Sequence, residues 1–117
     1  MMPEIIAHRG ASYLAPENTL TAFRKAMEIG ADGVEMDVQQ TGDKKLVIHH
    51  DFLIDWHTDM RGQIYDMTME ELKALDFGSW KDVSYKDERI ATLQEALAGA
   101  RYFARAAGEL YTSCVKK

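Results

Sequence analysis

The chain has almost no cysteine. Cys114 is the only one in 117 residues, so no internal disulfide can form. A single thiol also excludes a cysteine-rich zinc site, which requires several thiolates. We therefore expect neither a disulfide scaffold nor a structural zinc centre, and Cys114 is interpreted as incidental to function.

Long apolar runs and an excess of positive charge are also missing. No stretch approaches the roughly 18 to 20 apolar residues that span a bilayer, and the first six residues include an acid and no signal-peptide core. We therefore expect a cytoplasmic protein without a membrane span. The formal net charge of -5 at pH 7 argues against nucleic-acid binding, because phosphate backbones are bound by clustered Lys and Arg.

The composition that remains is typical of a globular domain. Hydrophobic residues make up 46% of the chain and charged residues 28%, which is ordinary for soluble proteins. The length suits one domain, or part of one, with a single modest core.

The first elements are expected to be strand, helix and strand. Ile5–Ala7 is a short apolar run that ends before a glycine turn, as a buried strand does. Apolar residues at 19–29 recur with helical spacing, and Asn18 and Gly30 are the expected N-cap and C′ residues. The segment DGVEMDVQQT, residues 32–41, then alternates Val34, Met36 and Val38 with Glu35, Asp37 and Gln39, which predicts a strand with an acidic face.

A β-hairpin should follow, because turn residues separate this strand from the apolar run Leu46–Ile48. A turn centred between Gly42 and Asp43 would set His50 opposite Glu35.

Two later helices are predicted from capping-box patterns that begin at Thr68 and Thr92. The apolar stripe of the second helix extends to Ala107, and Gly108 would end it. The remaining segment, ELYTSCVKK, has no clear class.

Two carboxylates, Glu35 and Asp37, should project from one face of the acidic strand, about 6.5 to 7 Å apart along it. Two acids directed into an interior need a positive partner, and such hard oxygen ligands suit Mg²⁺ or Ca²⁺ better than zinc. The alternative is the solvent face of an edge strand, where acids are common, and the pair taken alone favours it.

Two histidines and an arginine shift that balance. His8 and His50 each end a predicted strand, and a histidine pair on either side of a substrate can act as general base and general acid. Arg9 offers a planar donor fork for a phosphate oxygen. Each histidine alone would more often be a strand-end residue bound to a backbone carbonyl, but the combination favours a catalytic site.

Neighbouring polar residues have two interpretations each. His49 alternates with His50, so it should be structural on the opposite face. His57 lies in the following loop with no informative spacing. Glu17 precedes a helix, where an acid is often only a dipole partner, and Asp51 either orients His50 or forms a turn.

Four segments resemble a known family. AHRGASYLAPENTLTAF and GADGVEMDVQQTGDKKLVIHHD, and more loosely TMEELKALDFG and RIATLQEALAGA, are similar to the first part of the glycerophosphodiester phosphodiesterases, which are phospholipase-C-like phosphodiesterases. The resemblance covers about residues 5–99 and leaves 100–117 unmatched. It depends on the order and spacing of the HRG, PENT, E-x-D and HD elements.

The resemblance implies an α/β fold, an incomplete TIM (β/α)8 barrel with the first two barrel strands, their helices and an inserted β-hairpin. The site would lie at the carboxyl ends of the strands. It implies hydrolysis of a glycerophosphodiester to glycerol phosphate and an alcohol, with Ca²⁺ or Mg²⁺ as cofactor. The positions that match the family are His8 and His50 (catalytic pair), Arg9 and Glu17 (substrate and phosphate pocket), and Glu35 and Asp37 (metal ligands).

The chain departs from the family pattern in two places. A complete barrel takes about 250 residues, and ELYTSCVKK does not match the third strand, which brings the remaining acidic ligand and a lysine. Trp56 and His57 stand where the family usually has Arg and Thr. Three interpretations follow: a truncated enzyme with little activity, an assembly in which copies or a partner chain supply the missing strands, or a non-enzymatic metal- or phosphate-binding fragment.

Overall fold

The computed structural model describes residues 3, 5–98, 102–106 and 109–115. The strands are β1 (Ile6–His8), β2 (Gly33–Gln40), β3 (Leu46–Ile48), β4 (Ala91–Thr92), β5 (Tyr102–Ala106) and β6 (Glu109–Val115). The α-helices are α1 (Leu20–Glu28), α2 (Met69–Lys73) and α3 (Leu93–Leu97), with 3-10 helices at Ile64–Asp66 and Val83–Tyr85. No helix in these ranges is both long and apolar enough to cross a membrane.

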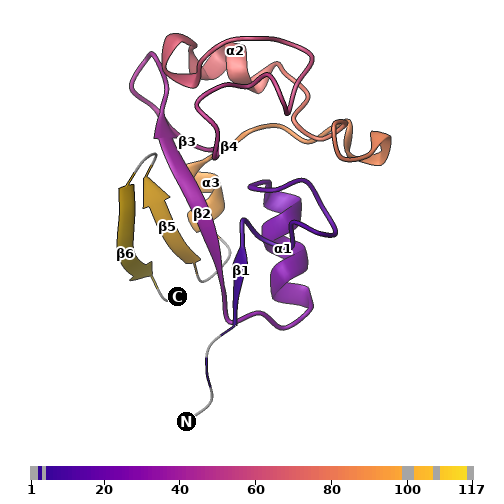
Figure 1. The fold of residues 1–117 in the computed structure, drawn as a ribbon, viewed down its shortest axis with the longest axis vertical. Helices are drawn as coiled ribbons and strands as arrows, with labels where there is room; N and C mark the ends of the chain where they lie inside the picture. Colours follow the sequence, from indigo (N-terminus) through magenta and orange to yellow (C-terminus); the bar gives the residue numbers. More distant parts are fainter. Residues whose placement is uncertain (1–2, 4, 99–101, 107–108, 116–117) are drawn as a thin grey trace.

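β2 is the centre of one mixed sheet (Figure 1). β1 runs parallel to its first half, and β3 runs antiparallel to its second half. β5 runs parallel to β2 along the other edge, followed by antiparallel β6. The chain is therefore a mixed α/β structure, built outward from a strand with neighbours on both sides.

The alternation of β2 separates a core face from a polar face. Val34 and Met36 are fully buried and pack with Phe23 of α1 and Ala96 of α3 in the first core cluster. Because successive side chains of a strand point to opposite faces, the acids of β2 project away from this cluster. The predicted strand is confirmed, and its interpretation as a solvent-exposed edge is wrong, because β2 lies inside the sheet and Asp37 is 3% exposed.

A second core cluster lies under α2. It consists of Val47, Ile54, Ile64, Leu72, Phe77 and Ile90. The segment 50–90, which supplies most of it, lies beyond the carboxyl ends of β1 and β2 (Figure 1). Neighbouring residues of β3 contribute to different clusters, Val47 to the second and Ile48 to the first, so β3 joins the two.

The helix starts follow local sequence signals, with one shift. Thr19 rather than Asn18 caps α1, because the Thr19 side chain accepts a hydrogen bond from the backbone of the first turn. Gly30 follows the helix with φ 93°, as expected for a C′ residue. Both capping boxes, at Thr68 and Thr92, are formed, which confirms the starts of α2 and α3.

The predicted extension of the last helix is wrong. α3 ends at Leu97, and Tyr102–Ala106 forms strand β5 instead. Helix propensity is a weak local preference, and in this alanine-rich stretch the pairing with β2 along residues 34–38 overrides it. The expected helical residues Ala100, Ala107 and Gly108 lie outside the described residues. β5 is a third parallel strand, which the sequence analysis did not anticipate.

The hairpin forms with a register shifted by one residue. Val38 faces Ile48, and pairing stops there. His8, not His50, is the residue opposite Glu35. The turn accommodates the shift by placing Lys44 at φ 63°.

Candidate active site

The polar face of β2 holds the backbone on both sides of His50. The Gln39 amide donates hydrogen bonds to the carbonyl oxygens of His49 (2.7 Å) and Asp51 (2.6 Å). The backbone N–H of His49 also donates to the carbonyl oxygen of Asp37 at 2.8 Å. β2 therefore fixes where the second histidine leaves the sheet, and Gln39 is a positioning residue that sequence reasoning did not identify.

His8 and Glu35 form the first contact of the site. They are direct neighbours across the β1–β2 pairing, and His8 Nε2 lies 3.4 Å from Glu35 Oε1. The His8 side chain is 62% exposed and that of Glu35 is 12% exposed. The imidazole is thus open to a ligand, while the carboxylate behind it is largely buried.

Arg9 lies between two carboxylates. Its Nη1 donates to Glu17 Oε2 at 2.9 Å, and its Nε lies 3.5 Å from Asp37 Oδ2. A turn with φ 60° at Arg9 and φ 79° at Gly10 aims the guanidinium at both acids. The positive charge offsets the cost of burying Asp37.

Asn18 completes the environment of Asp37. Its Nδ2 donates to Asp37 Oδ2 at 3.1 Å, and its Oδ1 accepts from the backbone N–H of Asp37 at 3.3 Å. Asn18 is buried, at φ 59°, a conformation that Asn tolerates better than most residues. The sequence signal was present in the PENT element, but a polar residue before a helix was interpreted as a cap.

His50 is oriented by Asp51. His50 Nδ1 lies 2.7 Å from Asp51 Oδ1, and the two side chains are 44% and 31% exposed. Burial raises the pKa of Asp51, but the hydrogen bond to His50 and the charges of the nearby histidines outweigh it, so the pKa lies below its usual value. Of the two roles considered for Asp51, this contact supports the orienting one.

The other two histidines are buried behind the site. His49 Nε2 lies 3.3 Å from the Leu53 carbonyl oxygen, and burial followed by the charge of His57 lowers the pKa of His49 to about 4. The interpretation of His49 as structural agrees with this placement. His57 lies 3.7 Å from both Glu17 and Asp51, a contact that its sequence spacing did not reveal.

The candidate residues thus fall into three connected groups. They are His8 with Glu35, Arg9 with Glu17 and Asp37, and His50 with Asp51. In the part of the chain that the structure describes, no group of three or more His, Cys, Asp or Glu side chains could hold a metal ion. The carboxylates of Glu35 and Asp37 still fit the donor chemistry of Mg²⁺, which often binds one or two carboxylates together with water and phosphate oxygens.

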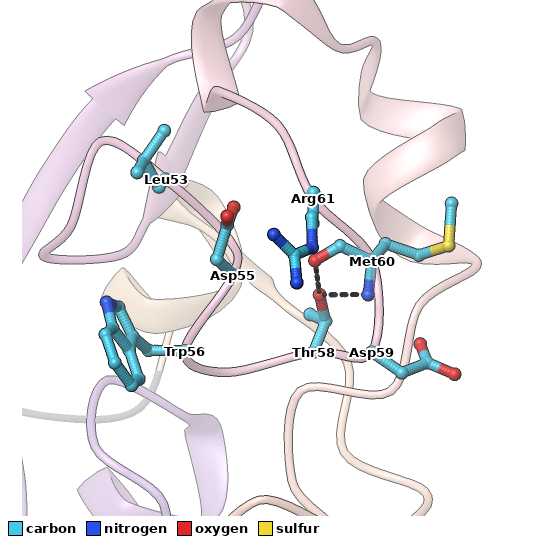
Figure 2. A pocket seen from close by; sticks show the side chains of 7 residues that line it. All are labelled: Leu53, Asp55, Trp56, Thr58, Asp59, Met60 and Arg61. Carbon is cyan, nitrogen blue, oxygen red and sulfur yellow. Dashed lines mark hydrogen bonds between the residues drawn. The ribbon is translucent and has the colours of Figure 1, made fainter.

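A separate cavity of about 510 Å³ lies on the loop after His50 (Figure 2). It is lined by Leu53, Asp55, Trp56, Thr58, Asp59, Met60 and Arg61. The Thr58 hydroxyl donates to the Met60 carbonyl oxygen and accepts from the Met60 N–H, which closes a turn at one wall. None of the six candidate site residues lines this cavity, so the charged network and not this hollow defines the site.

Comparison with known proteins agrees with this geometry. The profile of the glycerophosphoryl diester phosphodiesterase family matches residues 8–107, from the first site histidine to just beyond β5. The chain belongs to this family. The matched range includes all six candidate site residues.

Individual relatives are similar over most of this chain. A glycerophosphodiester phosphodiesterase of Caldanaerobacter subterraneus is 50% identical over 91 residues, which cover 78% of this chain and 37% of the relative. Human glycerophosphodiester phosphodiesterase 1 is 44% identical over 95 residues, which cover 80% of this chain and 29% of the relative.

A solved structure has the same fold over the described part. The phosphodiesterase of Oleispira antarctica, in complex with the product sn-glycerol-3-phosphate, superposes with a TM-score of 0.84 at 43% identity. The alignment covers 90% of this chain and 44% of that one. The chain therefore spans less than half the length of these glycerophosphodiester phosphodiesterases.

Proposed function

We propose that this chain carries the first part of an active site that hydrolyses glycerophosphodiesters to glycerol phosphate and an alcohol. The observation that carries the proposal is the Arg9 guanidinium, held by Glu17 and Asp37 directly after the His8 end of β1. Such a fork suits a phosphate oxygen. The incomplete (β/α)8 barrel is proposed with it, since β1, β2 and β5 are parallel neighbours.

His8 and His50 are proposed as the acid and base. Both imidazoles are substantially exposed and each is oriented by a carboxylate, Glu35 for His8 and Asp51 for His50. One histidine takes a proton from the nucleophile and the other protonates the leaving alkoxide. The proposal leaves open which histidine is the acid, and Glu17 contributes by holding Arg9 in the phosphate pocket.

Glu35 and Asp37 are the residues that would hold a divalent cation, Ca²⁺ or Mg²⁺. When bound, such a cation polarises phosphoryl oxygens and stabilises developing negative charge. The protein's part is to present two hard oxygen donors on one strand face. Asn18 and Arg9 keep Asp37 in position there.

Hydrolysis of glycerophosphocholine by the purified chain tests the proposal. We expect turnover that requires Ca²⁺ or Mg²⁺ and that His50→Ala reduces at least about a hundredfold, in the range for loss of a general acid or base. Glu35→Gln should abolish the turnover that Ca²⁺ or Mg²⁺ supports. Glu70→Gln, an identical chemical change on the exposed side of α2, is the matched control and should leave turnover unchanged.

A second candidate function is binding without turnover. It is favoured by the Arg9 guanidinium, which suits a phosphate oxygen without any further catalytic group. Isothermal titration calorimetry with Mg²⁺, Ca²⁺ or inorganic phosphate, together with the hydrolysis assay, separates the two functions, because a binding module takes up metal or phosphate but releases no alcohol. If self-association or a partner chain adds ligands, the turnover number per chain should rise with protein concentration. A cytoplasmic location stays a prediction.

A further inference from the structure

His57 lies at the middle of the charged network. Its Nε2 is 3.7 Å from Glu17 Oε2, and its Nδ1 is 3.7 Å from Asp51 Oδ2. Glu17 in turn holds Arg9 at 2.9 Å, and Asp51 holds His50 at 2.7 Å. One imidazole therefore stands between the acid that orients the phosphate fork and the acid that orients a catalytic histidine.

Aromatic neighbours fix the His57 ring in this place. The ring packs edge-to-face against His49 at 4.8 Å and against Trp80 at 4.7 Å between centroids. Trp80 is itself anchored by its indole N–H, which donates to the Phe77 carbonyl oxygen at 2.9 Å. With the His57 side chain only 10% exposed, the ring cannot turn away from the two acids without displacing His49 or Trp80.

The charges around His57 oppose one another. Burial lowers the pKa of His57, Glu17 and Asp51 raise it, and Arg9 and His50 lower it, with a net decrease. His49 adds little positive charge at neutral pH, because its own pKa is about 4. Each ring nitrogen thus faces a carboxylate oxygen at 3.7 Å, beyond hydrogen-bond distance, and the ring separates the two orienting acids.

We propose that His57 is a positioning residue that keeps Glu17 and Asp51, and through them Arg9 and His50, at a fixed separation. Its effect on turnover rests on the proposed function.

Imidazole NMR titration tests the proposal without relying on catalysis. The chain has only four histidines, so single substitutions assign every signal. His57→Leu removes both ring nitrogens at similar volume, and His57→Gln keeps an amide donor. His49→Leu is the control, since His49 packs on the same ring but directs its Nε2 to the Leu53 carbonyl.

We expect the pKa of His50 to fall by roughly half a unit in His57→Leu, because Asp51 is then no longer held against His50. His57→Gln should give a smaller fall, and His49→Leu should leave the pKa of His50 unchanged. If the chain turns over substrate, His57→Leu should lower kcat about tenfold with little change in KM, and His57→Gln should restore part of it.

An unchanged pKa of His50 in folded His57→Leu and His57→Gln would overturn the proposal. It would also be overturned if both variants unfold while His49→Leu stays folded, because His57 would then be a core residue only. A wild-type chain without turnover argues against the proposed function instead, and the NMR comparison still decides the role of His57.

Discussion

Two residues with positive φ stand at the centre of the site. Arg9 and Asn18 have φ 60° and 59°, and each contacts the carboxylate of Asp37. The left-handed conformation costs most residues about 1 to 2 kcal/mol. Such local strain persists only where surrounding contacts determine it. Here the backbone N–H of Asn18 donates to the Arg9 carbonyl at 2.9 Å, which ties the two strained residues together.

Substitution of Asn18 should separate strain from hydrogen bonding. Asn18→Gly loses both hydrogen bonds to Asp37 but tolerates φ 59°, whereas Asn18→Ala loses the same bonds and keeps the strain. We expect Asn18→Ala to lower the free energy of unfolding by about 3 kcal/mol and Asn18→Gly by about 2 kcal/mol. Urea denaturation measures both, and equal losses would show that φ at this position carries no strain.

The buried His49 should make stability depend on pH. Its pKa is 6.5 when unfolded and about 4 when folded, so the unfolded chain binds the proton more tightly. Above pH 6.5 the ring is neutral in both states and its burial costs no stability. As the pH falls from 6.5 toward 4, protonation of the unfolded chain lowers the free energy of unfolding by about 3 kcal/mol in all. Urea unfolding at pH 7 and pH 4.5 should therefore differ more for the wild type than for His49→Gln. An equal decrease in both proteins would assign the effect to other groups.

For helices and strands, signals between neighbouring residues predicted the structure correctly, whereas contacts between distant residues were not predicted. The capping boxes at Thr68 and Thr92 depend on residues three apart, so the sequence alone predicts where α2 and α3 begin. The end of α3 and the existence of β5 depend on pairing with β2, whose residues lie more than 60 positions earlier in the numbering. Alternation of Val34 and Met36 with the acids predicted β2. The register of the hairpin depends on the conformation of its turn, which the sequence did not predict.

The same distinction applies to the site. The six candidate residues of the family motifs could be predicted because each motif is short and contiguous. Gln39, Asn18 and His57 were missed because their partners come from distant segments, such as Asp37 for Asn18. A polar residue whose partner is 19 positions away has no local signature.

The packing of α1 against the β1–α1 turn requires glycine at position 10. A Cβ on Gly10 would lie 2.7 Å from the Ala22 backbone carbon, and φ is 79°. Gly30 also has positive φ, 93°, but a Cβ there meets nothing within 4 Å. We expect Gly30→Ala to cost about 1 kcal/mol and Gly10→Ala about 3 kcal/mol or more.

Urea denaturation of both glycine variants gives the comparison, and activity gives a second readout. Because the turn at Gly10 carries Arg9, Gly10→Ala should also lower turnover, whereas Gly30→Ala should not. Similar losses of stability in both variants would mean that the turn can move away from α1 without cost.

At the scale of the whole molecule, β3 connects two cores that the chain builds in different ways. The first cluster joins β2 to α1 and α3, and the second is formed mostly by the segment after β3. Val47 and Ile48 are adjacent, yet each is fully buried in a different cluster. The site lies where the two parts meet, since Arg9 and Glu17 come from one and Asp51 and His57 from the other. Its geometry therefore depends on both cores being folded together.

Two spectroscopic signals test whether the two core clusters unfold together. Both tryptophans, Trp56 and Trp80, lie in the segment after β3, so their fluorescence reports the unfolding of that segment, whereas far-ultraviolet circular dichroism reports the whole chain. Phe23→Ala in the first cluster and Leu72→Ala in the second should each cost about 3 kcal/mol, since both side chains are buried. If β3 couples the clusters, both variants shift the fluorescence and dichroism transitions in urea by the same amount. A Phe23→Ala variant that shifts the dichroism transition but leaves the tryptophan transition in place would show that the segment after β3 folds independently. The charged network from Arg9 to His50 would then join two separate units.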